Sequence, residues 1–102
     1  MPLDYVLEDE NHTALREIGD PKGVLSGLLD RAFQERLPLL SGIDRYGDTT
    51  FNRHQMAPVL QELGRLSEWA ETDEQKSLLK EIVALCQECE SRVHTYITIV
   101  GD

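Results

Sequence analysis

The most β-branched stretch of the chain is Thr-Tyr-Ile-Thr-Ile-Val at residues 95–100. Five of its six residues are β-branched and the sixth is aromatic, a composition typical of a strand. A strand this apolar needs a sheet to join, because its buried backbone N–H and C=O groups require hydrogen-bond partners. Those partners must come from another part of the chain.

A hairpin near the N-terminus is the only candidate. Residues 4–18 contain two runs with Tyr, Val, Leu and Ile, separated by the polar cluster Glu-Asn-His at residues 10–12. Turn-forming residues follow at Gly19-Asp20-Pro21. The sequence thus predicts a β-hairpin over residues 4–18 that pairs with a strand over residues 95–100.

Three segments between these strands carry apolar residues at helical spacing. The first covers residues 22–37, with Phe33 on its apolar face, and Asp20 or Pro21 at its start. Pro38 ends or kinks this helix.

The other two helices are marked by their N-terminal residues. Asn52 and Gln55 have the spacing of a capping box, as do Thr72 and Gln75, and the third helix runs to about Arg92. The predicted fold is α+β, a single domain over residues 1–102. A small antiparallel sheet, made of the N-terminal hairpin and the C-terminal strand, packs against the three helices.

Charge limits the classes of partner. The chain has 10 Lys and Arg against 19 Asp and Glu, a net charge of -9. A phosphate backbone and an anionic membrane are both repelled, so we expect neither nucleic-acid nor membrane binding. A basic protein or a cation is attracted over a long range, although acidity also serves solubility alone.

Other classes are disfavoured by what the sequence lacks. No stretch approaches the roughly 20 apolar residues of a membrane span, and the first four residues have no basic start of a signal peptide. We therefore expect a cytoplasmic protein. Cys86 and Cys89 stand three apart within an apolar helical stripe, which predicts core residues rather than a zinc or redox site. No Ser-His-Asp order, Gly-rich phosphate loop, nucleophile elbow or His-Glu-x-x-His motif appears. We therefore expect no enzyme and, apart from calcium under the alternative given below, no cofactor.

One stretch has the pattern of a binding loop. Residues 42–52 are expected to form a polar, turn-rich loop between the first two helices, and residues 43–63 resemble a single EF-hand. This resemblance implies a calcium ion held by the loop over residues 44–55. The ligands that it implies are Asp44, Asp48, Thr50, Asn52 and Gln55.

The loop departs from the EF-hand pattern at three positions. Tyr46 stands where the family has an acid or amide, Thr49 where it has Gly, and Gln55 where it has a bidentate Glu. Two carboxylates remain, which predicts weak calcium affinity. The alternative is that the two acids form turns while Asn52 caps the next helix. The stretch is also similar to small uncharacterised bacterial proteins, a resemblance that implies no function.

The sequence therefore predicts a non-enzymatic, acidic protein-binding module. The most specific form of this hypothesis is an inhibitor or immunity-type protein that masks a basic partner. We expect Asp44, Tyr46, Asp48 and Trp69 to bind it, since carboxylates complement Lys and Arg and aromatic residues anchor interfaces. The alternative is a weak calcium- or cation-responsive module that uses the loop over residues 44–55. The oligomeric state stays open.

Overall fold

The structure is a computed structural model that describes residues 2–101. Within that range the sheet has four strands, β1 (Leu3–Asp9), β2 (Ala14–Asp20), β3 (Asp48–Asn52) and β4 (Thr95–Val100). Their order is β2-β1-β4-β3, and all neighbours are antiparallel. The β-branched strand β4 therefore lies inside the sheet and pairs with the N-terminal hairpin. The predicted α+β fold is confirmed.

Strand β3 corrects the prediction that residues 42–52 form a loop. Thr50 pairs with Thr98, and Phe51 pairs with Ile97 of β4. Phe51 is the one buried side chain of β3, so the strand lacks the alternation of apolar residues by which a strand is recognised in a sequence. Its pairing with β4 holds it in the sheet instead.

Three α-helices connect the strands: α1 (Ser26–Gln34), α2 (Met56–Trp69) and α3 (Asp73–Ser91). Two short 3-10 helices, η1 (Leu40–Gly42) and η2 (Arg53–Gln55), lie on either side of β3. Both predicted capping boxes are present, one at the start of η2 and one at the start of α3. The predicted order of helices is confirmed.

Helix α1 is shorter than predicted at both ends. The buried Asp20 carboxylate accepts hydrogen bonds from Val24 N at 2.8 Å and Leu25 N at 3.0 Å, which holds a turn before the helix. At the other end Arg36 adopts a left-handed conformation with a φ of 58°, so the helix stops before Pro38. Asp20 thus contributes to the entry into α1, although the helix itself begins at Ser26.

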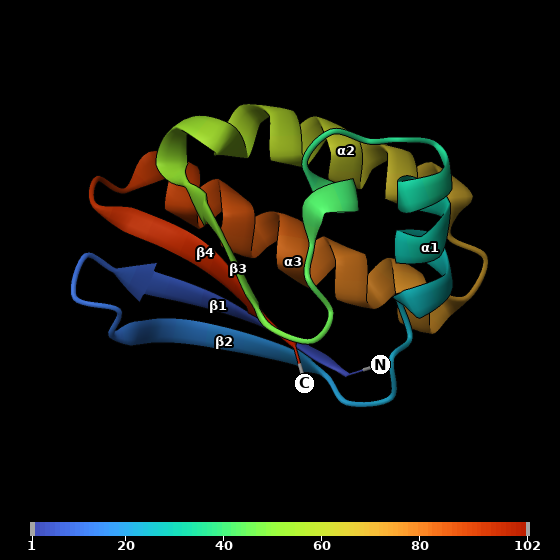
Figure 1. The fold of residues 1–102 in the computed structure, drawn as a ribbon, viewed down its shortest axis with the longest axis horizontal. Coiled ribbons are helices and arrows are strands. Elements are labelled where there is room, and N and C mark those ends of the chain that lie inside the picture. The colour runs from blue at the N-terminus through green and yellow to red at the C-terminus, as the bar shows by residue number, and fades with distance from the viewer. Residues whose placement is uncertain (1, 102) are drawn as a thin grey trace.

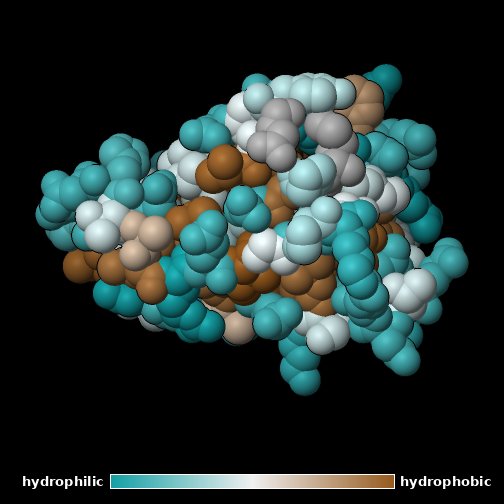
Figure 2. All heavy atoms as spheres, turned by 90° about the horizontal axis from the view of Figure 1, so that it is seen from below, coloured by the Kyte–Doolittle hydropathy of each residue, from teal (hydrophilic) through white to brown (hydrophobic). Residues whose placement is uncertain are grey.

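The helices lie on one side of the sheet, and no described helix covers the other face (Figure 1). Leu3, Tyr5 and Leu7 of β1 point into the buried cluster that the helices share. Because side chains alternate along a strand, Asp4 and Glu8 lie on the opposite face. Seen from the side where β1 and β2 lie, the surface shows a band of apolar side chains between hydrophilic ones (Figure 2).

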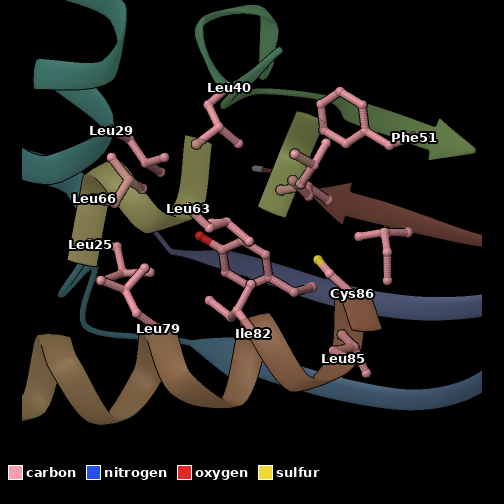
Figure 3. Packing of buried hydrophobic residues seen from close by; sticks show 14 of the residues in the cluster. Leu25, Leu29, Leu40, Phe51, Leu63, Leu66, Leu79, Ile82, Leu85 and Cys86 are labelled. Atoms are coloured by element: carbon pink, nitrogen blue, oxygen red, sulfur yellow. The ribbon is translucent and has the colours of Figure 1, made fainter. Parts of the chain in front are cut away.

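The core fills the space between the helices and the sheet. Leu29 of α1, Leu66 of α2 and Leu79 of α3 converge there with side chains from the sheet (Figure 3). Both cysteines are free and buried, as predicted for core residues. Burial, and then the neighbouring Cys89, raise the pKa of the Cys86 thiol to about 12, so this thiol stays protonated near neutral pH.

Candidate functional site

The outer face of the sheet gathers carboxylates from three strands. Asp4 and Glu8 of β1 lie on this face together with Glu17 of β2, which pairs with Val6 between them. On the other side of β1, Val100 of β4 pairs with Asp4 and also with Asp48 of β3. Asp48 therefore lies on the same face. We call this surface the acidic face. Its other positions are Val6, Ala14, Gly19, Thr50, Asn52, Tyr96, Thr98 and Val100. None of these positions among the described strands is Lys or Arg, so every formal charge on the acidic face is negative.

The centre of the acidic face is neutral and well packed. Val6 and Thr98 pair across β1 and β4 and are both buried, although no helix covers them. The Thr98 hydroxyl donates to the Glu8 carboxylate, and its oxygen lies 3.0 Å from the hydroxyl oxygen of Thr50 on β3. These contacts join three strands. The face therefore combines a rigid, largely uncharged centre with an acidic border.

A second surface lies between α1 and the segment that leads into β3. A groove of about 450 Å³ runs there, and its walls include Leu29, Leu40 and Ile43. Phe33 from α1 is 68% exposed and Tyr46 from the turn before β3 is 77% exposed, and both line this groove. We call this surface the aromatic groove. Large aromatic side chains that are exposed together are a feature of interaction sites.

The prediction that Phe33 faces the core is wrong, because its side chain is exposed. It follows Leu29 by one turn, but it lies in the last turn of α1, beyond the buried residues of that helix. The opposite wall, at residues 40–46, leaves the groove open instead of covering the ring.

Hydrogen bonds shape the turn that forms one wall of the groove, and an ion pair joins this turn to α1. The Asp44 carboxylate accepts from Tyr46 N at 2.9 Å, while Asp44 N donates to the Thr49 hydroxyl at 2.8 Å. Arg45 Nη1 lies 2.7 Å from Asp30 Oδ1, an ion pair between the turn and α1. The position of Tyr46 is therefore set by its neighbours. Two residues predicted to bind a partner, Asp44 and Tyr46, belong to this groove.

Glu62 of α2 supports the groove from inside the protein. Its buried carboxylate accepts from Leu40 N at 2.8 Å and, through both oxygens, from Leu39 N at 3.1 Å. These bonds satisfy the N–H groups at the start of η1, which would otherwise be unpaired. Glu62 thereby ties the segment before β3 to α2.

Trp69 lies apart from both surfaces. It is half-buried at the end of α2, against the core, with the guanidinium of Arg31 4.3 Å and that of Arg65 5.3 Å from the ring centroid. Arg31 belongs to α1, so this cation–π contact joins α1 to α2. Of the four residues predicted to bind a partner, Asp44 and Tyr46 thus lie together at the groove. Asp48 lies on the acidic face, and Trp69 packs between α1 and α2.

The five residues implied as calcium ligands have other roles in the structure. Asn52 and Gln55 form the capping box of η2, with hydrogen bonds of 2.8 and 3.1 Å. Thr50 contacts Thr98, and Asp44 holds Tyr46. The extended backbone of β3 carries Asp48 and Asn52 about 13 Å apart along the strand, whereas calcium ligands lie about 2.3–2.6 Å from one ion.

We expect calcium to leave the protein's stability unchanged. An ion that binds only the folded state raises the melting temperature by mass action, but the strand geometry of residues 48–52 gives no shell for one. The measurement is a thermal melt in excess EDTA and again in calcium at about 1 mM, with magnesium as control. A rise of several degrees that Asp44→Ala removes and magnesium does not reproduce would contradict this prediction and support the EF-hand interpretation.

Two further properties of the described chain bear on its function. No group of three or more His, Cys, Asp or Glu side chains within residues 2–101 is placed to hold a metal ion. The same residues contain no helix with the length and apolar character to span a membrane. Comparison with known protein families, curated proteins and solved structures finds no match to this chain.

Four residues of the two surfaces were not predicted from the sequence as binding residues: Asp4, Glu8, Glu17 and Phe33. A signal for the first two was present, because Asp4 and Glu8 stand at an even spacing in β1 and so share one face. Glu17 needed the register of the hairpin. The exposure of Phe33 needed the position of the opposite wall, which no local pattern contains.

Proposed function

We propose that this protein is a non-enzymatic binding module that docks a basic protein on its acidic face, as an inhibitor or immunity-type protein does when it masks a partner. The observation that supports this proposal most directly is the charge of that face. Its border holds Asp4, Glu8, Glu17 and Asp48, and none of its other positions carries Lys or Arg. The net charge of -9 extends the same field over the molecule.

The physical argument rests on complementarity. Negative potential steers a positively charged partner toward the surface and discriminates against acidic proteins. Tyr96 and Val100 of β4, which are partly exposed on the same face, offer apolar contact once the partner arrives. The hydroxyl contacts at the centre of the face keep it ordered before binding, so little conformational entropy is lost there.

The test compares two triple variants that change the net charge equally. Asp4→Asn, Glu17→Gln and Asp48→Asn neutralise exposed carboxylates of the acidic face. Glu68→Gln, Glu71→Gln and Glu81→Gln neutralise exposed carboxylates on and between the helices. Because three charge pairs at an interface are lost, we expect the first set to weaken binding of a capped hexa-arginine peptide by about tenfold or more at low salt.

The second set should weaken binding only slightly, by about twofold, through the long-range field. Titration calorimetry gives the affinities, and amide chemical shifts of labelled protein locate the peptide on β1, β3 and β4. Equal losses in the two sets would mean that the overall charge attracts the peptide, and the acidic face would then not be the site.

The same variants test whether a natural partner binds the acidic face. A protein captured from cells of the source organism supports the proposal if it is basic, if it is lost with the acidic-face variant, and if it is retained with the helix variant. A captured protein that the helix variant loses, or that binds both variants equally, contradicts the proposed surface.

A further inference from the structure

The aromatic groove is separate from the acidic face and has a different character. Two rings project into solvent, Phe33 and Tyr46, and the walls between them combine apolar and polar side chains. Its charged lining residues carry both signs, since Arg45 pairs with Asp30 at 2.7 Å and Asp44 lies in the turn. Aromatic residues with few unpaired charges are what interface centres contain.

We propose that this groove binds a second copy of the chain, so that the protein forms a two-fold dimer. In a two-fold interface the same surface patch serves both partners and must complement itself. The aromatic groove meets that requirement, because each copy offers both a projecting ring and a groove whose walls include apolar side chains. Phe33 of one copy enters the groove of the other, and the reverse contact follows by symmetry.

Charge decides between the two surfaces as self-association sites. Four carboxylates on a face that carries no Lys or Arg repel an identical face, so the acidic face does not pair with itself. The ion pair of Arg45 with Asp30 brings opposite charges to the groove, and it leaves no comparable repulsion there. A second copy therefore fits the groove and a basic partner fits the sheet.

The groove also has enough apolar surface for a modest interface. An aromatic side chain buries roughly 150–250 Å² when it is fully covered, and four rings take part in a two-fold contact. Phe33 and Tyr46 are 68% and 77% exposed, so most of that area is still accessible in one copy. Four rings supply a substantial share of the roughly 1,600 Å² of a standard interface.

The test is the oligomeric state of the full chain. Sedimentation equilibrium over about 10–500 µM should show a mass that rises from 11.6 kDa toward twice that value, with a dissociation constant in the micromolar range. Phe33→Glu and Tyr46→Glu should each weaken the dimer by about tenfold or more, because a carboxylate enters an apolar contact. Val93→Glu is the control, since Val93 is 65% exposed outside the groove.

The result that overturns the proposal is a monomer at every concentration, or a dimer that Val93→Glu dissociates as strongly as Phe33→Glu. The dimer proposal does not depend on the proposed function, and the two predict opposite responses to added salt. Added NaCl screens the repulsion between two copies of charge -9 and should tighten the dimer, whereas it should weaken hexa-arginine binding. Either surface can therefore fail its test without the other.

Discussion

Glu62→Ala is expected to lower the free energy of unfolding by about 3 kcal/mol, because it leaves buried N–H groups without acceptors. The Glu62 carboxylate accepts bonds from Leu39 N and Leu40 N, and Leu40 is itself buried. Alanine is a better helix former than glutamate, so helix propensity works against the loss and does not explain it. The measurement is equilibrium unfolding in urea.

Glu68→Ala is the matched control. Glu68 is exposed on the same helix, so its replacement should change the free energy of unfolding by about 0.5 kcal/mol or less. The loss for Glu62→Gln should lie between those for Glu62→Ala and Glu68→Ala, because the amide offers one acceptor oxygen in place of two. Hydrogen exchange at Leu39 and Leu40 should accelerate in Glu62→Ala. Equal losses for Glu62→Ala and Glu68→Ala would show that these bonds do not stabilise the fold.

Glu62 also links stability to the aromatic groove. The segment that it anchors continues through Leu40 and Ile43 of the groove wall to the turn that carries Tyr46. Loss of the anchor therefore loosens the wall at residues 40–46. In the sequence, a glutamate within an amphipathic helix is typical of a solvent-facing position, so only the fold identifies its role.

The elements that the sequence predicted correctly are those whose signals are local. Capping boxes need two side chains three residues apart, and both are present in the structure. The strand over residues 95–100 carries its signal in six adjacent residues and occurs as β4. The hairpin follows from two strands and a short turn, and it occurs as β1 and β2.

The features that were wrong or missed depend on contacts far apart in the sequence. Strand β3 has one buried side chain, Phe51, and is held by β4, which follows more than 40 residues later. Residues 42–52 have the polar, turn-rich composition of a loop, but residues 48–52 form a strand because they pair with β4. The same pairing puts Asp48 on the acidic face beside residues of β1 and β4. The place of Asp48 on the acidic face thus arises from the order of the strands, which no local pattern in the sequence specifies.

Leu66→Ala is expected to lower the free energy of unfolding by about 3–5 kcal/mol, at least as much as Glu62→Ala. Leu66 of α2 is fully buried and packs where α1, α2 and α3 meet, beside Leu29 (Figure 3). Removing its methyl groups loses the free energy gained when they are transferred from water to the core. It also leaves a cavity that the rigid neighbours fill only in part. Alanine favours the helix, so the loss reports packing alone.

Leu60→Ala is the control for this prediction, since Leu60 lies on the same helix but is only partly buried against the core. Its replacement should cost about 1 kcal/mol. In urea, both variants should keep the slope of the unfolding transition while Leu66→Ala moves the midpoint much further. Because Leu66 and Trp69 both join α2 to α1, the double variant Leu66→Ala with Trp69→Ala should lose less than the sum of its parts. Strict additivity would mean that α1 is held to α2 by two independent contacts, and that the wall carrying Phe33 does not move as a unit.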